Sequence, residues 1–501
     1  MAEVSLQKFQ PSRSDPWDQA KAAHLTGRAG FGGTPDEVAR LAALPFGEAV
    51  DYILEYERIP DGPFPEMDFS EERDLVASLE GLRRRHADEP TLRAAFQLLQ
   101  RVSAQKFEEI RAGWLRRMMQ TPRPLQEKMV LFWHGHLVSG FPDVKLAEHM
   151  AMQLSLFREM ATGNFKDLML AVSRDPAMLS YLDNNSNRKG KPNENYAREL
   201  MELFTLGVGN YTEQDVKQAA RAFTGWTFAG NDFVVRRNEH DDDVKTFLGR
   251  TGRWDGADVI DIIFQQPLAS RYLPRKLFEF FVYPGAEDSV LDELSSVFRN
   301  SNWSVKAVLR VLFRSALFYS PKAMRSQVKS PVQLVVGAVR ALGADVPEQA
   351  LLRAIDLMGQ TLLYPPNVGG WPKGKGWINT ATILVRYNFS SLLLDGRMPG
   401  LDARQFAAGG PPTGMGARRV IPARVDHLVD TSQVKSVGDV ITQLVDRFIQ
   451  TPLGPRKRWA LLRAFGTNHE DTPVTGDNAR FANQLRTAVH LIMSMPEYQL
   501  T

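Results

Sequence analysis

Residues 193–204, NENYARELMELF, have the apolar period of a helix and not of a strand, and this period indicates the fold class. Tyr196, Leu200 and Leu203 recur every three or four positions, which places them on one helical face. Gly207 follows within a turn, where helices commonly end. The sequence around this stretch repeats the same period, so this helix is one of many.

Longer helical patterns lie on both sides of this stretch. Residues 90–120 carry an apolar stripe at every third or fourth position, and Thr34 to Glu37 forms a capping box with proline at the first helical position. The best hairpin signal is two short apolar runs at 226–228 and 233–235, separated by Ala-Gly-Asn-Asp. The sequence therefore predicts a mainly α protein, a large multi-helix globular fold with a small β-hairpin insertion near residues 226–235.

The composition of the 501 residues is that of an ordinary globular protein, with 43% apolar and 24% charged residues. Residues 397–419 include a Gly-Gly-Pro-Pro-Thr-Gly run and have no helical period. We therefore predict a main helical domain over residues 1–396 that carries the site, a flexible connection over 397–419, and a C-terminal helical segment over 420–501 packed on the main domain.

Charge and cysteine content exclude several classes of function. The 61 basic and 58 acidic residues give a net charge of +3, which does not favour nucleic acid as a partner. The absence of cysteine excludes disulfides and thiolate metal sites. No segment has the apolar length of a membrane span or a secretory signal, so we expect a cytoplasmic protein, or a periplasmic or secreted one if the chain is a processed form.

Four of the nine histidines fall between residues 134 and 240, in the region richest in helical glutamate. His134 and His136 would point about 200° apart on a continuous helix but would share a face in extended backbone. If the helix ends at Trp133, with Gly135 permitting the break, both imidazoles can bind one metal ion. The alternative is that one histidine packs in the core and the other caps the end of the helix.

His240 and Asp241 follow the predicted hairpin and begin the run His-Asp-Asp-Asp. A histidine beside an aspartate can bind a metal, or the aspartate can orient the imidazole for acid–base catalysis. Acidic clusters in loops are also commonly only solvated.

The helix from Asn193 places Glu194, Arg198 and Glu202 four residues apart along one face. This spacing is typical of a surface ladder of ion pairs. Four asparagines precede or begin the helix, and they can orient a polar ligand or satisfy the turns of their own loop. Basic residues bracket the loop and favour an anion such as a phosphate or carboxylate, although a chain with so many basic residues contains such clusters by chance. These residues are Arg188, Lys189, Lys191, Arg236, Arg237, Lys245, Arg250 and Arg253.

These motifs together resemble the signature of a bacterial family catalogued as "domain of unknown function 1800". The resemblance rests on several blocks spread over most of the chain. They are Phe132-Trp133-His134, Tyr181-Leu182-Asp183-Asn184, NENYAREL at 193–200, Thr224-Gly225-Trp226, and the block from Pro365-Pro366-Asn367 to Trp377. The family implies a mostly helical architecture but no activity, substrate or cofactor.

The resemblance also implies a partner and a set of positions. A frequent gene neighbour in the family resembles a secreted member of the alkaline phosphatase superfamily, and many relatives begin with an export signal. His134, His136, His240 and Asp241 match the family pattern. The family helix usually reads Glu-Leu-His-Thr-Leu-Gly, whereas this chain has Phe204 at the histidine position, so a site that needs that histidine would be degraded here.

The first functional hypothesis is a metal-dependent enzyme, redox or hydrolytic, acting on a small polar or anionic substrate. Its predicted ligands for iron, manganese or zinc are His134, His136 and His240 with Asp241 or Glu199. The predicted catalytic residues are Glu194, Arg198 and Asp183, with Glu194 or Asp183 transferring the proton.

Two other hypotheses remain open. One is a non-catalytic binding or assembly partner of an alkaline-phosphatase-superfamily-like protein, with the asparagine loop and the Trp371 loop as contact surfaces. The other, weaker because Asp241 follows a predicted hairpin, is a phosphohydrolase of the helical His-Asp type.

Overall fold

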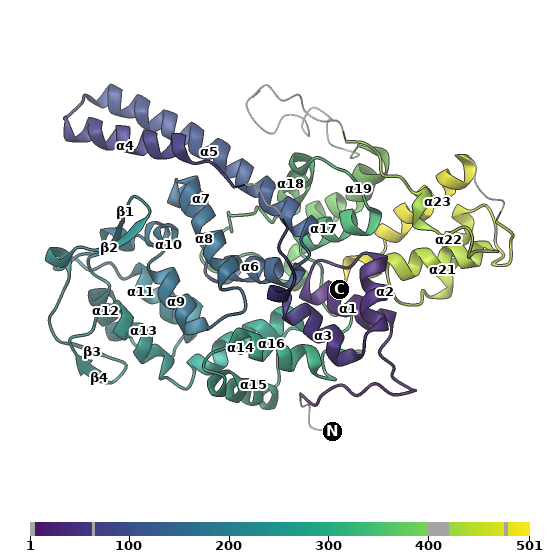
Figure 1. The fold of residues 1–501 in the computed structure, drawn as a ribbon, viewed down its shortest axis with the longest axis horizontal. Coiled ribbons are helices and arrows are strands. Elements are labelled where there is room, and N and C mark those ends of the chain that lie inside the picture. The colour runs from purple at the N-terminus through teal and green to yellow at the C-terminus, as the bar shows by residue number, and fades with distance from the viewer. Residues whose placement is uncertain (1–5, 63–65, 398–419, 475–478) are drawn as a thin grey trace.

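Helices pack against one another along most of the chain in the computed structural model, which describes residues 6–62, 66–397, 420–474 and 479–501 (Figure 1). The mainly α fold with a small hairpin is therefore confirmed. The helices of the first half are α1 Gln19–Ala29, α2 Pro35–Ala43, α3 Phe46–Leu54, α4 Ser70–Arg84, α5 Glu89–Gln120, α6 Pro124–His136, α7 Phe141–Val144, α8 Ala147–Glu159, α9 Phe165–Ser173, α10 Pro176–Tyr181, α11 Asn195–Glu199 and α12 Glu213–Ala222.

The second half continues the same architecture after two short hairpins. Its helices are α13 Gly256–Phe264, α14 Ala269–Phe281, α15 Asp288–Asn300, α16 Val305–Arg314, α17 Pro331–Leu342, α18 Glu348–Leu357, α19 Thr380–Asp395, α21 Val437–Phe448, α22 Pro455–Ala464 and α23 Ala479–Met493. Short 3-10 turns connect several of these helices.

The helix starts follow the capping signals of the sequence. Thr34 and Glu37 form the predicted capping box of α2, with each side chain accepting a hydrogen bond from the other residue's backbone N–H. The side chain of Asp175 caps α10 in the same way, by accepting from the N–H of Met178. These local bonds satisfy N–H groups that have no partner within the helix.

The predicted hairpin is confirmed, with β1 Trp226–Ala229 antiparallel to β2 Asp232–Val235 and Trp226 opposite Val235. A second hairpin was not predicted from the sequence. It pairs β3 Lys245–Phe247 with β4 Arg250–Gly252, and its strands are too short for an alternating pattern to be recognised.

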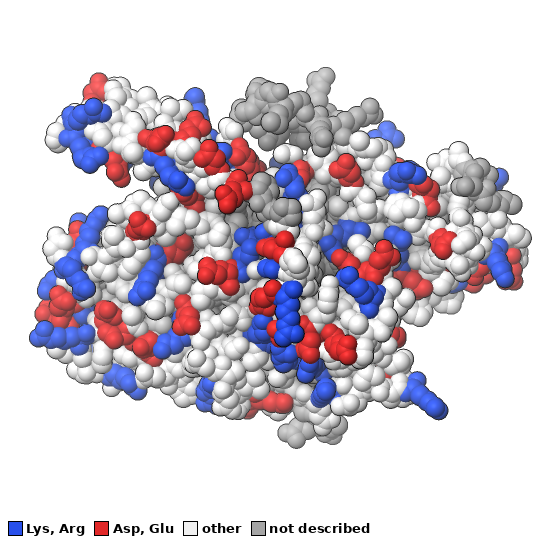
Figure 2. Space-filling model, viewed as in Figure 1, with Lys and Arg blue, Asp and Glu red and all other residues white. Residues whose placement is uncertain are grey.

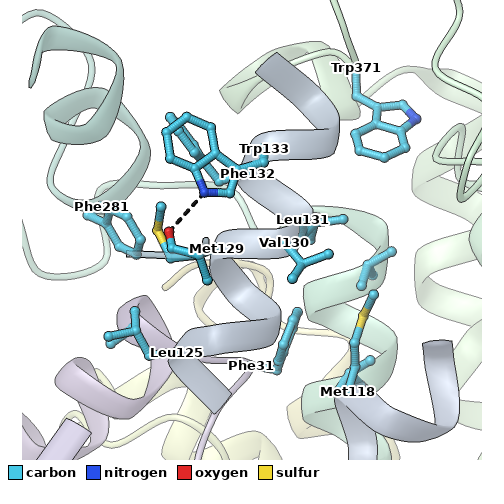
Figure 3. Packing of buried hydrophobic residues seen from close by; sticks show 14 of the residues in the cluster. Phe31, Met118, Leu125, Met129, Val130, Leu131, Phe132, Trp133, Phe281 and Trp371 are labelled. Atoms are coloured by element: carbon cyan, nitrogen blue, oxygen red, sulfur yellow. Dashed lines mark hydrogen bonds between the residues drawn. The ribbon is translucent and has the colours of Figure 1, made fainter. Parts of the chain in front are cut away.

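Helix α6 lies at the centre of the hydrophobic core (Figure 3). Leu125, Met129 and Val130 are fully buried on it, and Trp133 donates its indole N–H to the carbonyl of Ala161 at 2.8 Å. Almost every residue of α6 is buried, including the polar Gln126, Glu127 and Lys128, so its apolar residues do not form a single stripe. This explains why the helical period is weak in this element.

Helices α4 and α5 form an antiparallel arm that projects from the body at the upper left of Figure 1. The C-terminal half of α5 packs into the body, whereas its first half contacts α4. The carboxylate of Glu72 fixes the base of the arm by accepting the backbone N–H groups of Ala147 and Glu148, each at 2.9 Å. Ser103 of α5 also donates to Glu72.

The described residues after 419 contact the rest of the body through backbone hydrogen bonds. Ala423 donates its N–H to Leu393 at 2.8 Å, and Val328 pairs with Leu500 as an antiparallel bridge. The predicted connection at 397–419 lies, except for residue 397, outside the described residues, and the predicted division into domains stays a prediction. Over the ranges described, no helix combines the length and the apolarity needed to cross a bilayer.

Candidate functional site

Helix α6 continues through both predicted metal-binding histidines. It ends at His136, so the backbone between His134 and His136 is helical and the two rings point to opposite sides. Gly135 does not break the helix, and Gly370 and Trp371 pack directly on it. A Cβ on Gly370 would lie 2.3 Å from the carbonyl oxygen of Gly135. The condition under which both imidazoles would bind one ion is therefore absent.

His134 lies in an aromatic shell with no exposed surface. Its ring centroid is 5.4 Å from Trp371, 5.9 Å from Trp114 and 6.4 Å from Phe157. Among the described residues, neither ring nitrogen has a hydrogen-bond partner, and neither has the Nε1 of Trp371. Burial lowers the pKa of His134 to about 3, so the ring is neutral at ordinary pH.

His136 lies on the opposite side of α6 and is bonded to the backbone. Its Nε2 is 3.1 Å from the carbonyl oxygen of Phe204, the residue at the family's histidine position. Its ring stacks with Phe132 at a centroid distance of 5.7 Å. Burial, with repulsion from Lys276 and Lys373, lowers its pKa to about 3.

His240 and Asp241 are held by separate partners after the first hairpin. The Nδ1 of His240 lies 2.7 Å from the carbonyl oxygen of Thr224, and its Nε2 lies 3.8 Å from Asp242. Asp241 accepts two hydrogen bonds from Arg221, of 2.7 and 3.2 Å. Burial alone would raise the pKa of Asp241, but the bonds from Arg221 and from the N–H of Asp243 lower it overall. Both side chains thus stabilise the loop in which they lie.

Of the predicted catalytic residues, Glu194 is the N-cap of α11 and Arg198 lies within that helix, whereas Asp183 precedes the 3-10 turn Asn184–Ser186. Arg198 bonds Glu213 at 2.7 Å and Glu194 at 3.3 Å, the second pair having the i, i+4 spacing of a ladder. Asp183 is exposed, with a left-handed backbone at φ 55°. Glu199 is half-buried, and burial together with the charge of Glu202 raises its pKa. Directly after Glu199, residues Leu200–Thr205 form a π-helix, a rare element that is frequent at functional sites.

The structure does not bring the proposed ligands together. No three histidine, aspartate or glutamate side chains among the described residues are grouped closely enough to hold a metal ion. His134 and His136 lie among aromatic rings, while His240 and Asp241 belong to the loop after the hairpin. These side chains therefore do not converge on one point in this conformation. The metal-dependent enzyme and the His-Asp phosphohydrolase stay predictions.

The asparagine loop before α11 forms a polar cavity of about 590 Å³. This volume is within the usual range of small-molecule sites. The cavity is lined by Asn185, Ser186, Arg188, Lys191, Pro192, Asn193, Glu194, Arg236 and Glu239. Among the residues predicted as catalytic or metal-binding, it includes Glu194.

Two of the loop asparagines are internal supports for this cavity. Asn184 and Asn187 are each 1% exposed. The amide of Asn184 donates to Trp226 at 3.2 Å, and that of Asn187 donates to Ala220 at 2.9 Å. The oxygen of Asn187 also accepts the N–H of Asn193 at 2.9 Å. The two alternatives for the loop thus apply to different residues, since Asn184 and Asn187 satisfy the turn while Asn185 and Asn193 line the cavity.

Glu239 is a lining residue that the sequence analysis did not select. Its carbonyl oxygen accepts the N–H of Lys189 at 2.7 Å, which fastens the segment after the hairpin to the loop. This contact joins positions fifty residues apart and leaves no local pattern in the sequence.

Comparison with known proteins places the chain in one family. The model of the family described as "Protein of unknown function (DUF1800)" matches residues 24–500. No curated protein and no solved structure matches the chain.

Proposed function

Because the chain belongs to the DUF1800 family, whose function is unknown, we propose a role from its geometry: it binds a small anionic ligand in the polar cavity of the asparagine loop. The observation that carries the proposal is a pair of cations, Arg188 and Lys191, on a loop that is fixed before any ligand arrives. Neither side chain makes a hydrogen bond or ion pair with a residue in the described ranges.

The charge balance of the cavity favours an anion. Three basic side chains, Arg188, Lys191 and Arg236, line it against two acidic ones. Arg236 lies 3.6 Å from Glu239, and Glu194 is engaged with Arg198 at 3.3 Å. Arg188 and Lys191, which have no partner in the described ranges, are therefore the groups available to bind a ligand.

The chemistry of the lining narrows the ligand class. Arginine binds carboxylates and phosphates through two parallel N–H groups, and lysine adds a point charge. The amides of Asn185 and Asn193 supply both donors and acceptors for a polar portion of the ligand. We infer a small phosphorylated or carboxylated molecule with further polar groups.

The rigidity of the loop supports binding without rearrangement. Its backbone is bonded to Glu239 through Lys189 and to Gly225 through Asn187, with N···O distances of 2.7 and 2.8 Å. A site organised before binding loses less conformational freedom when the ligand arrives.

The test is calorimetric titration of the full chain with a panel of small phosphorylated and carboxylated compounds. We expect the double variant Arg188→Gln/Lys191→Gln to weaken binding at least about tenfold, corresponding to about 1.4 kcal/mol. Arg250→Gln, which removes an exposed arginine of β4 outside the cavity, is the control and should leave affinity unchanged. Equal affinity in the double variant and the wild type would refute the proposal.

A second candidate function, assembly with a protein partner, is favoured by the α4–α5 arm. The arm projects from the body (Figure 1, Figure 2). It exposes Phe96 and Leu98, which are 39% and 48% accessible. The partner class expected from the family is a protein resembling the alkaline phosphatase superfamily.

Co-purification of the two proteins tests this second candidate. We expect Phe96→Ser/Leu98→Ser to abolish complex formation, whereas Gln97→Ser, between them on the same exposed turn, should retain it. Retention by both variants would exclude the arm as the contact surface.

A further inference from the structure

A second, smaller cavity of about 70 Å³ lies where segments far apart in the sequence meet. Its walls come from α1 and the following glycine-rich turn at 27–33, from α17, and from the segments 447–450 and 498–501. Gly337 of α17 packs so closely on the turn that a Cβ there would lie 2.7 Å from the carbonyl oxygen of Phe31. The cavity is therefore bounded by tightly packed backbone.

Three cations line this cavity, and none forms a salt bridge with a carboxylate in the described part of the chain. They are Arg325, Lys329 and Arg447. Arg447 donates to the carbonyl of Ala341 at 3.1 Å. The side chains of Arg325 and Lys329 make no hydrogen bond to a described residue, although the ammonium of Lys329 lies 4.2 Å from the ring centroid of Tyr498.

Arg28 is a fully buried cation directly beside this wall, whereas the three lining cations are half-buried. It follows Gly27 in the last turn of α1 and is 1% exposed. Its Nη2 donates to Ala323 at 2.6 Å and to Ser326 at 3.0 Å, on either side of the lining residue Arg325. Its Nε and Nη1 have no partner.

Two acidic residues lie near this set, but neither forms a salt bridge with it. Glu497 lies near Arg325, with one of its oxygens paired to Lys457, and Asp36 lies near Arg447. Desolvation lowers the pKa of Lys329 to about 7, with Arg325 and Arg386 adding repulsion, and lowers that of Arg28 to about 9. A buried cation without a counter-charge is costly, and an anion placed among several of them offsets that cost.

The size of the cavity limits the anion. At about 15 Å³ for each water-sized atom, four oxygens need about 60 Å³, which is close to the space present. A nucleotide or sugar phosphate would have to extend beyond this space. We propose that this cavity binds a single tetrahedral oxyanion, phosphate or sulfate, which joins the glycine-rich turn, the residues before α17 and the C-terminal segment.

This site is separate from the asparagine loop, so the two proposals can fail independently. The experiment measures thermal unfolding of the full chain in chloride buffer and after addition of phosphate or sulfate at matched ionic strength. In the Arg188→Gln/Lys191→Gln background, which removes the cations of the asparagine loop, we expect both oxyanions to raise the Tm and glycerol phosphate not to do so.

Lys329→Met is the decisive variant, because it removes one cation and keeps most of the side-chain volume. In chloride it should unfold at the same Tm as the wild type or higher, and its affinity for phosphate should fall at least tenfold. Lys276→Met, which also removes a lysine near a tyrosine ring, at 5.0 Å from Tyr272, is the control and should respond as the wild type does.

Two results would overturn the inference. One is the absence of any phosphate or sulfate response in the wild type. The other is an equal response in Lys329→Met, which would identify weak ion binding at the surface. If Lys329→Met does not fold, Arg325→Gln serves the same comparison, with the same expected loss of affinity.

Discussion

His134 shows how a residue chosen for its chemistry can serve packing instead. Its neutral ring fills a space among Trp114, Phe157 and Trp371, and both nitrogens lack partners. In the unfolded chain the imidazole has an ordinary pKa near 6.5, whereas burial holds the folded value at about 3. Protons therefore bind the unfolded state more tightly between these values.

The two pKa values fix the direction in which the free energy of unfolding changes with pH. The free energy of unfolding should fall as pH decreases from about 6.5 towards 3, by up to about 1.4 kcal/mol per pH unit from this residue. We expect His134→Leu to lack this part of the acid destabilisation in urea unfolding measured at pH 7, 5.5 and 4. His86→Asn, at an exposed turn, is the control and should retain it.

The same variant tests the metal hypothesis. We expect the transition-metal content of His134→Leu to equal that of the wild type after identical purification, because the ring lies among aromatic side chains. Loss of a bound metal in His134→Leu would instead support the metal-dependent enzyme.

Asp175 has the opposite pH dependence. Burial raises its pKa to about 7, although it accepts bonds from Met178 and Gln153. The folded state therefore binds the proton more tightly, and its stability contribution declines as pH rises from about 4 to 7. Asp175→Asn keeps an oxygen for the cap and should remove this decline in unfolding titrations. An unchanged slope would show that Asp175 ionises freely in the folded protein.

At the level of single helices, local signals in the sequence predicted where helices start. They did not predict features that involve contacts between distant parts of the chain. The caps at Thr34 and Asp175 lie within four residues of the groups they bond, so the sequence shows them directly. The continuation of α6 to His136 depends on the loop around Gly370, more than two hundred residues away. The π-helix after Glu199 was likewise not predicted, because a π-helical turn in the sequence has the same apolar pattern as an α-helical one.

The contact between Gly370 and α6 can be tested with two glycines of one loop. Gly370 and Gly374 both have positive φ, of 89° and 53°, but only Gly370 has backbone within 4 Å of its missing Cβ. Alanine at either site incurs a conformational cost of about 1–2 kcal/mol. We expect Gly370→Ala to lower the unfolding free energy by at least about 2 kcal/mol more than Gly374→Ala, because of steric overlap with Gly135. Equal losses in chemical denaturation would show that the loop moves aside.

At the scale of the whole molecule, the candidate site could not be assembled from the sequence. Its motifs pointed to a loop whose residues Arg188, Lys191 and Glu194 line one cavity, and the site itself stays a prediction. The sequence did not show that His134 and His136 point to opposite sides of α6, or that Asp241 forms a salt bridge with Arg221. Both facts depend on which helices pack together, and the same holds for the small cavity between residues 27–33 and 498–501.

The contacts of the C-terminal segment predict how the molecule responds to a break in the chain. Residues 327–329 pair with 499–501, and Ser390 bonds His490 at 2.9 Å. A protease site inserted within 398–419 and then cut should leave two fragments that co-elute in size-exclusion chromatography. With Leu393→Asp, which places a charge at a fully buried position beside Ala423, we expect the fragments to separate. Separation of the fragments without that substitution would show that the covalent link is needed.

The α4–α5 arm can act as a lever on the body. Helix α5 is about 48 Å long at 1.5 Å per residue, and the carboxylate of Glu72 near its base grips the first two residues of α8. A push at the tip, around His86, therefore acts as a torque at that anchor. Because α8 packs against α6, a force applied at the tip of the arm would be transmitted to α6, the helix that carries His134.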